Sequence, residues 1–344
     1  MTVYLAGYQA SSILRGGAAV QLLNTCKYLG DFGIDARLFD SWTPFQPETC
    51  DLFHLFASDV GMYHLGREIH ALRIPIALSP ITYSLHSHRF IRTALAASRM
   101  VQRVGYGVWT DYAITSDLCS WARLILPNTR DEASLITEGY RAPADRVTVI
   151  PNGVDERFVH ADPALFKKTY GIEGFILNVG HTGHVRKNVL ALIRALARID
   201  HPAVIIGRIV RTPYGDACLR EAGKNKNILL IDAIDHDSEM LASAYAACDV
   251  FAMPSLFETP GIAALEAGLA GAKVVITPYG GTKDYFGSMA EYVDPHSVES
   301  IREGIVRALQ KNQDDRLRVH IRKEFLWPRV AEKTAAAYRT IITR

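Results

Sequence analysis

Several features that would place a protein in a class at once are missing from this sequence. The cysteines are five in number, lie far apart, and include no Cys-x-x-Cys pair; they are Cys26, Cys50, Cys119, Cys218 and Cys248. This pattern argues against disulfide bonds and against a zinc site. We therefore expect buried thiols in a reducing compartment, and the cytoplasm is the predicted location.

Long apolar runs and a strong net charge are also missing. No stretch approaches the roughly 18–20 apolar residues of a transmembrane helix. Residues 1–7 have neither a basic region nor a long apolar stretch, so no signal peptide is expected. Lys and Arg number 38 against 36 for Asp and Glu, which gives a net charge of only +2. No field of one sign therefore points to nucleic acid as a partner.

What the sequence does contain is a double alternation of strands and helices. The length of 344 residues, 49% of them hydrophobic, favours two domains. The expected strands are 3–7, 36–40, 52–56, 75–79, 123–127 and 147–151, followed by 175–180, 203–207, 228–232, 250–254, 273–277 and 291–294. Helical patterns between them predict two parallel sheets, each covered on both faces.

The boundary between the two halves is predicted near Pro151-Asn-Gly-Val-Asp155, because Asn-Gly permits a turn with positive φ. We expect a first domain over residues 1–153 and a second over 154–326. Residues 327–344 are expected to form a helix that packs back on the first domain.

The most informative segment is Glu258-Thr-Pro-Gly-Ile-Ala-Ala-Leu-Glu266, which follows an expected buried strand. Pro260 suits the first helical position, so a helix is predicted to start near Gly261. A strand, a loop and a helix N-terminus together form an anion site. Glu258 would lie at its mouth and Glu266 about two turns into the helix, where the carboxylates could accept hydrogen bonds from sugar and ribose hydroxyls. A capped surface helix with two solvated acids is the alternative.

Two further segments suit a phosphate. Gly16 and Gly17 precede an apolar helix, and paired glycines let backbone N–H groups approach an anion. Loop flexibility explains them equally well. In the second half, His181, Arg186 and Lys187 lie between a strand and a helix, where they could neutralise a diphosphate. Basic residues at a helix start oppose the helix dipole unless an anion is present.

Six ordered segments carry a resemblance to a known family. They are Asp51-Leu-Phe-His54, Leu126-Pro-Asn-Thr-Arg-Asp-Glu132, Val149-Ile-Pro-Asn-Gly-Val-Asp155, Ala244 to Ser255 with the two glutamates that follow, Gly281-Thr-Lys-Asp-Tyr-Phe-Gly287 and Tyr292-Val-Asp-Pro295. With them the chain resembles the nucleotide-sugar glycosyltransferases of family 4, which are retaining enzymes. The resemblance covers nearly the whole chain. It implies a GT-B fold, in which two Rossmann-like, doubly wound parallel-sheet domains face a central cleft.

The same resemblance implies an activity and a set of roles. The first domain would bind the acceptor and the second the donor. A hexose such as mannose or glucose would pass from a nucleotide-diphosphate sugar to an acceptor hydroxyl with retained configuration, in the assembly of cell-surface polysaccharide or glycolipid. The acceptor would be a carbohydrate or a lipid-linked glycan, and neither a cofactor nor a metal ion would be needed. The implied catalytic residues are Glu258, Lys187 and His181, and the implied donor-binding residues are Gly16, Gly17, Arg186, Gly261, Ile262 and Glu266.

Three positions depart from the family pattern. His181 stands where the family usually has arginine, and imidazole carries full charge only when protonated. Ile81 stands where a histidine often lies near the sugar; His86 and His88 follow a few residues later. Pro260 has no N–H, so one backbone contact to the donor is lost. These departures bear on rate and donor choice more than on fold.

Other functions stay open with less support. A non-catalytic sugar-nucleotide-binding protein with a degenerate GT-B site is the main alternative. A nicotinamide dehydrogenase lacks its Gly-x-Gly-x-x-Gly after a strand, and a sugar-nucleotide epimerase would share the fold but not the six segments. Asp235-His-Asp237 resembles a metal-binding Asp-x-Asp. We interpret Asp237 instead as the N-cap of a helix over residues 238–247.

One stretch of the first half bears on where the protein works. On a helical wheel Arg89, Arg92, Arg99 and Arg103 share one sector, whereas Phe90, Ala94, Ala97, Val101 and Val104 share another. Such a helix could lie on an anionic membrane surface and meet a lipid-linked acceptor. Equally, its apolar side could pack on the first sheet and leave the arginines in water.

Overall fold

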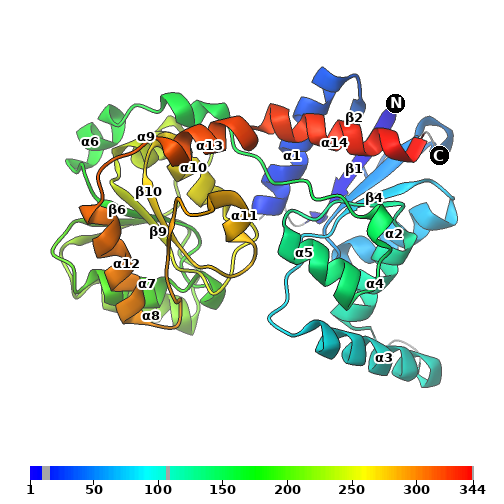
Figure 1. Cartoon of the computed structure of the whole chain (residues 1–344), viewed down its shortest axis with the longest axis horizontal. Coiled ribbons are helices and arrows are strands. Elements are labelled where there is room, and N and C mark those ends of the chain that lie inside the picture. The colour runs from blue at the N-terminus through cyan, green and yellow to red at the C-terminus, as the bar shows by residue number, and fades with distance from the viewer. Residues whose placement is uncertain (10–15, 106–108, 343–344) are drawn as a thin grey trace. The chain divides into compact units, whose positions relative to one another are not determined.

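The computed structural model describes residues 1–9, 16–105 and 109–342. The chain divides into two units (Figure 1): unit 1 comprises Met1–Gly153 with Trp327–Arg344, and unit 2 comprises Val154–Leu326. No helix in the described part of the chain is both long enough and apolar enough to cross a bilayer.

Unit 1 is built on a parallel sheet with the strand order β2-β1-β3-β4-β5. Its strands are β1 (Thr2–Gly7), β2 (Asp35–Leu38), β3 (Leu52–Phe56), β4 (Ile76–Ser79) and β5 (Leu124–Ile125). Every residue of β3 and β4 is buried, because helices cover both faces of the sheet. The order reverses between β1 and β3, which makes the sheet doubly wound.

Two helices lie on each face of this sheet. The helices α1 (Gly17–Leu29) and α14 (Trp327–Ile342) share one core with Val3, Leu5 and Phe56. The helices α2 (Val60–Ala71) and α4 (Asp111–Trp121) share the other core with Phe53 and Leu55. Further out, α3 (His88–Val104) packs against α4, and the short α5 (Arg130–Ser134) follows β5.

Unit 2 is built on a second parallel sheet, with the order β11-β10-β9-β6-β7-β8. The strands are β6 (Ile176–Val179), β7 (Ala203–Ile206), β8 (Ile228–Ile231), β9 (Val250–Met253), β10 (Lys273–Ile276) and β11 (Glu291–Tyr292). From β6 the chain winds outward through β7 and β8, then returns to β9 on the other side of β6. The carboxyl ends of β6 and β9 therefore form the switch point of this sheet, where open α/β sheets bind ligands.

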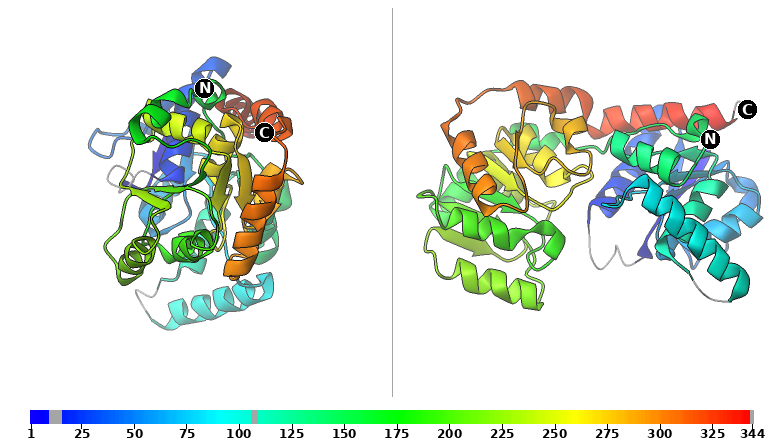
Figure 2. Two further views of the ribbon diagram at one scale, coloured as in Figure 1. Left: turned by 90° about the vertical axis from the view of Figure 1, so that its left-hand side faces the viewer. Right: turned by 60° about the horizontal axis from the view of Figure 1, so that its bottom comes forward.

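Helices cover both faces of this second sheet (Figure 2). One core holds residues of α6 (Ala164–Tyr170), α9 (Glu239–Ala247), α10 (Ile262–Ala270) and α13 (Arg316–Glu324). The opposite core holds residues of α7 (Val189–Leu196), α8 (Pro213–Ala222) and α12 (Val298–Gln310). The short α11 (Thr282–Phe286) lies between β10 and β11.

The chain passes between the units at Gly153–Val154 and again at Leu326–Trp327. In unit 1 the backbone of Gly153 lies against the buried Trp327, and a Cβ at position 153 would come within 2.4 Å of the indole ring. Only glycine permits this approach. In unit 2 the Val154 N–H donates to the Phe325 carbonyl over 2.8 Å.

The predicted fold class is confirmed, and one expected strand is wrong. Residues 147–151 run beside β5, with hydrogen bonds from Thr148 N to Ile125 O and from Ile150 N to Pro127 O, both 2.9 Å. They make a single bridge, between Ile125 and Val147, and no strand. The partner is too short for more, because β5 ends two residues before Pro127, which has no N–H to donate.

Candidate functional site

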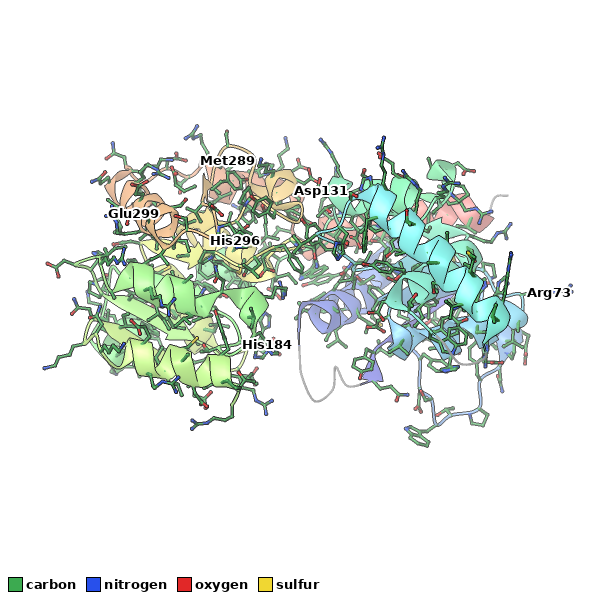
Figure 3. All side chains as sticks on the ribbon, turned by 90° about the horizontal axis from the view of Figure 1, so that it is seen from below. Arg73, Asp131, His184, Met289, His296 and Glu299 are labelled. Atoms are coloured by element: carbon green, nitrogen blue, oxygen red, sulfur yellow. The ribbon has the colours of Figure 1, made fainter. Side chains whose placement is uncertain are left out.

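The loop after β6 contacts the ends of the neighbouring strands closely. A Cβ at Gly207, whose φ is 154°, would lie 2.0 Å from the Gly180 carbonyl oxygen, so the ends of β6 and β7 can approach only because of glycine. Farther along, the Asn188 amide donates to the Pro254 carbonyl (3.0 Å) and to the Pro295 carbonyl (2.6 Å). One side chain thus links the loops that follow β6, β9 and β11. In Figure 3 the labelled His184 and His296 from two of these loops lie toward the same end of unit 2.

The loop after β9 is positioned by backbone hydrogen bonds to the loops after β6 and β10. The Leu256 N–H donates to the Arg186 carbonyl (2.8 Å), and the Glu258 N–H donates to the Tyr279 carbonyl (3.0 Å). Gly280, with φ 95°, crosses Glu258 so closely that a Cβ would lie 2.3 Å from the Glu258 carbonyl oxygen. Glu258 is therefore fixed between the loops after β6 and β10.

The helix start differs slightly from the prediction. Gly261, with φ 87°, is the N-cap, and α10 begins at Ile262. Pro260 precedes the cap and is not the first helical residue, so Glu266 lies about one turn into the helix and not two. The Pro-Gly pair permits a left-handed N-cap, but the tertiary structure decides whether one forms. The first N–H groups of α10 lack partners within the helix, as in any helix N-terminus.

Glu258 meets two cations at this end of the sheet. Its Oε1 lies 2.7 Å from Lys187 Nζ and 3.2 Å from Arg186 Nη1. The carboxylate is almost fully buried. Burial by itself raises the pKa of Glu258, but the charges of Lys187 and Arg186 outweigh it and hold that pKa below its ordinary value. Arg186 also donates to the Phe257 carbonyl over 3.0 Å and lies over the Phe257 ring.

The cluster of Glu258, Lys187 and Arg186 carries one net positive charge. Both cations remain partly exposed, Arg186 at 41% and Lys187 at 20% of the side chain, whereas Glu258 is 7% exposed. An anion arriving from solvent would reach the cations first. The arrangement is suited to a phosphate group that takes over the cations and to a hydroxyl that bonds to the carboxylate.

His181 follows Gly180 in the same loop, and its charge differs from that of arginine. Burial lowers the pKa of His181, and the nearby His184, Lys187 and Arg208 lower it further. The ring is consequently neutral at pH 7. Its buried Nδ1 has no hydrogen-bond partner among the described residues. Arg208, directly after Gly207 at the end of β7, is a further cation near this ring.

Glu266 lies in a second cluster. Its Oε2 accepts a hydrogen bond from the Tyr245 hydroxyl (2.8 Å), and its Oε1 lies 2.7 Å from His236 Nε2. Tyr245 belongs to α9 and is wholly buried, whereas His236 comes from the loop before α9. The hydrogen bond to Glu266 raises the pKa of His236 to about 9, so this ring is an imidazolium at neutral pH. Both partners lie in segments that the sequence analysis names, but neither was assigned a role there.

Comparisons with known proteins agree with this architecture. Residues 173–311, which include both clusters, match the family model described as Glycosyl transferases group 1. The structure superposes on sucrose-phosphate synthase from Thermosynechococcus elongatus with a TM-score of 0.75 and 17% identity, covering 100% of this chain and 99% of that one. Anabaena Alr3699/HepE in complex with UDP-glucose gives a TM-score of 0.71 at 16% identity, with 100% of both chains covered. The chain has the GT-B fold.

Among curated sequences, the chain is 32% identical to D-inositol 3-phosphate glycosyltransferase of Stackebrandtia nassauensis over 174 residues, which are 46% of this chain and 39% of that protein. The chain spans about half the length of the curated relatives it matches. The matched family span lies within unit 2, and both clusters lie inside that span.

The Asp235-His-Asp237 segment has a structural role, but not the predicted one. Ser238 caps α9, and its hydroxyl accepts from Met240 N (3.1 Å). Asp237 instead lies beside His236, with 3.1 Å between its Oδ1 and the ring Nδ1. The N-cap prediction for Asp237 is wrong, because Ser238 is one residue closer to the helix. Within the described ranges, no three His, Cys, Asp or Glu side chains gather as metal ligands do.

Gly16 and Gly17 belong to unit 1 of this GT-B chain. Gly16 is the extended N-cap of α1, and its carbonyl accepts from Val20 N (3.2 Å). A Cβ at Gly16 would meet no atom within 4 Å, so packing among the described residues does not require glycine there. A ligand could require it, because Gly16 lies after β1 at the switch point of the first sheet, where open α/β sheets bind ligands.

Unit 1 also contains a buried acid that ties two loops. Glu132 accepts from Thr82 N (2.8 Å) and from Asn128 N (2.6 Å), which joins the loops after β4 and β5. Burial raises its pKa to about 7. Next to Thr82, Ile81 has φ 50°, a strained value for a β-branched residue. Glu132 therefore shapes the loop that contains Ile81.

Proposed function

We propose that this protein is a retaining, metal-independent glycosyltransferase of family 4. It moves a hexose such as mannose or glucose from a nucleotide-diphosphate sugar to an acceptor hydroxyl. The observation that carries this proposal is the cluster of Glu258, Lys187 and Arg186 at the switch point of the second sheet. Support comes from the Glycosyl transferases group 1 match over the same residues and from the UDP-glucose held by the Anabaena protein of the same fold.

The donor diphosphate would bind Lys187, Arg186 and the N-terminus of α10 at Gly261 and Ile262. The bond between the anomeric carbon and the diphosphate oxygen breaks, and the electron pair leaves with the diphosphate. The acceptor oxygen attacks the same face of that carbon, and its proton passes to the leaving phosphate oxygen. Fixed cations and helix N–H groups stabilise the developing charge, and this electrostatic device requires no metal ion.

Glu258 changes partners during donor binding. In the structure its Oε1 neutralises Lys187 and Arg186. When the diphosphate takes those cations, the carboxylate becomes free to accept hydrogen bonds from the hydroxyls of the donor sugar. The low pKa of Glu258 keeps it an acceptor at neutral pH. Glu266, one turn into α10, would accept the ribose hydroxyls.

A neutral His181 favours the second candidate, a sugar-nucleotide-binding protein that does not catalyse transfer. The cation usual at this position is missing at pH 7, which removes part of the leaving-group stabilisation. Retention of Lys187, Arg186 and both glutamates supports the catalytic function more strongly. Binding of a nucleotide sugar without transfer or hydrolysis would identify the second candidate.

The acceptor side carries an exposed apolar face on α3. The helix turns Ile91 and Ser98 inward, and its outer face exposes four large apolar side chains, Phe90, Met100 (67%), Val101 and Val104 (91%). The apolar side therefore does not pack on the first sheet, the alternative that the sequence left open. Seen from below, α3 crosses the front of unit 1, and none of the described helices and strands of that unit lies over it in this view (Figure 3).

Basic residues border this face. Arg89 and Arg103 are exposed along one edge, and no Asp or Glu occurs in the sequence between Glu68 and Asp111. An apolar face edged with arginine is typical of helices that lie in the interface of an anionic bilayer. We propose that α3 contacts the inner face of the cytoplasmic membrane and that the acceptor is a lipid-linked glycan of a cell-surface polysaccharide or glycolipid. The five free thiols support a cytoplasmic location.

The transfer proposal is tested with the purified protein and a panel of UDP-, GDP- and ADP-hexoses, with hydrolysis as the readout until an acceptor is found. One donor should be consumed, at the same rate with and without excess EDTA. NMR of the product should show the anomeric configuration of the donor. Inversion, or loss of activity with EDTA that magnesium restores, would contradict the mechanism.

The membrane proposal is tested by flotation with phosphatidylglycerol vesicles and phosphatidylcholine vesicles at low salt. The protein should float only with the anionic vesicles. Met100→Ser with Val104→Ser, or Arg89→Gln with Arg103→Gln, should abolish flotation. Val319→Ser is the matched control, because Val319 is an exposed valine on α13. Equal flotation of all variants would show that α3 is not the contact.

A further inference from the structure

Nothing in the sequence resemblance gives a role to His236, yet its ring lies against a carboxylate assigned to the donor. His236 Nε2 is 2.7 Å from Glu266 Oε1, and its Nδ1 is 3.1 Å from Asp237 Oδ1. Resting on the proposed function, we propose that His236 is a positioning residue for the nucleoside, which holds the Glu266 carboxylate in the orientation that accepts both hydroxyls of the ribose.

The two partners of Glu266 bond to different oxygens and differ in exposure. Tyr245 is wholly buried and donates to Oε2 from within the core. The His236 side chain is 34% exposed, whereas that of Glu266 is 4% exposed. A ligand that approaches Glu266 from solvent therefore meets it beside His236.

The number of acceptor positions matches a diol. An ionised carboxylate offers about four lone-pair positions. Tyr245 uses one and His236 uses another. Two remain for the 2′- and 3′-hydroxyls of a ribose, and with both partners in place the carboxylate has little freedom to rotate. Preorganisation of this kind lowers the cost of ordering on binding.

Charge neutrality gives a second reason for a histidine at this position. Three ionisable groups act directly on the ring: Glu266 from α10, Asp237 from its own loop and Arg157 near the start of unit 2. Tyr245 from α9 bonds to the other oxygen of Glu266. Arg157 donates to the His236 carbonyl and has Nη1 4.0 Å from Asp237 Oδ1. The cations His236 and Arg157 balance the anions Glu266 and Asp237. A buried carboxylate without such a partner would be costly.

The pairing is sensitive to pH in one direction. The pKa of His236 is raised to about 9, chiefly by the bond to Glu266, from an ordinary value of 6.5. The ring is therefore charged at neutral pH, and its pairing with Glu266 is lost as the pH rises through about 9. The neutral ring has only one N–H, so above that pH it no longer donates to both Glu266 and Asp237, and the ion pair with Glu266 is lost.

The test is calorimetric binding of UDP, GDP and ADP to the whole protein at pH 7.5, followed by the 2′-deoxy form of the tightest ligand. The wild type should prefer the ribonucleotide, whereas His236→Ala should bind it roughly tenfold more weakly and lose most of that preference. In turnover, KM for the donor should rise with little change in kcat, because the ribose does not react.

The conservative variant separates positioning from folding. Gln has an N–H donor at a similar reach, so His236→Gln should restore most of the affinity and the preference for ribose. Wild-type affinity should fall between pH 8 and 10 more steeply than that of His236→Gln. His201→Gln is the control, because His201 is also half-buried and lies 3.8 Å from an acid, Asp249, before the amino end of β9. It should bind like the wild type.

The outcomes distinguish this inference from the proposed function. If the wild type binds none of the three nucleotides, the donor site itself is wrong. If the wild type binds one of them and His236→Ala keeps both affinity and ribose preference, His236 only supports the fold and the inference is overturned. Should His236→Ala fail to fold, the pH dependence of the wild type against His236→Gln decides.

Discussion

Glu258 and Glu266 lie eight positions apart in the sequence and are both buried, but their partners differ in kind. Glu258 pairs with the two cations Lys187 and Arg186. Glu266 pairs with Tyr245, which is neutral, and with His236, which can lose its proton. Both carboxylates have a partly exposed cationic partner, but only Glu266 has in addition a wholly buried, neutral one, Tyr245.

This difference suits two tasks in donor binding. Partners that are exposed and cationic can be transferred to a diphosphate, and they free Glu258 at that moment. A partner buried like Tyr245 cannot leave, so Glu266 keeps one orientation whether or not ligand is present. We infer that the first carboxylate acts in the reaction and the second holds a part of the donor that does not react.

The largest effect is expected at Glu258. Glu258→Gln removes the charge that faces the donor sugar, and kcat should fall by about a hundredfold or more. Steady-state hydrolysis of the preferred donor measures this. Glu266→Gln is the comparison: it should raise KM for the donor more than it lowers kcat. If both variants lowered kcat equally, the inference that only Glu258 acts in the reaction would be wrong.

Next in size is Lys187→Ala. The variant removes the nearer of the two cations, so kcat/KM should fall roughly a hundredfold, with both kcat and KM affected. Loss of Lys187 should also raise the pKa of Glu258, because its charge lowers that pKa in the wild type. Activity of the variant should therefore decline on acidification at a higher pH than that of the wild type. Arg186→Ala, at a more exposed position, should show a smaller loss of about tenfold.

Tyr245→Phe should mainly lower stability. It leaves Glu266 Oε2 buried without its donor, at a cost of roughly 1–3 kcal/mol. The thermal midpoint of unit 2 should fall by about 2–12 °C. Tyr338→Phe, which removes a buried hydroxyl 2.5 Å from the neutral His54 in unit 1, is the matched control and should cost less. The reverse order would show that the Glu266 network contributes little.

The smallest effect concerns His181. Its pKa lies below 6.5, so the wild type gains charge here only on acidification, and the stabilising charge is missing at pH 7.5. His181→Arg supplies a permanent charge and should raise turnover at pH 7.5 by about three- to tenfold, with less change between pH 5.5 and 7.5. A pH–rate profile identical to that of the wild type would remove His181 from the site.

The sequence predicted much of the fold from local pattern. Apolar segments such as 52–56 and 203–207 have the length and composition of buried parallel strands, and the structure has β3 and β7 there. The segment 147–151 has the same apolar character but forms no strand, since pairing depends on the length of its neighbour. A helical wheel could not predict the face on which α3 packs either. It separates two sectors of the helix but does not say which one contacts α4.

By itself, the sequence determined the α/β alternation and the apolar cores, because these follow from residue type and local spacing. Only the tertiary structure decided which side chains meet. Lys187 and Glu258 are 71 positions apart, and His236 and Glu266 are 30 apart. Their contacts exist because the order of the second sheet places β6 beside β9 and because α9 and α10 share one face. The protonation of His181 and His236 follows from those contacts, since burial and neighbouring charges, not residue identity, set a pKa.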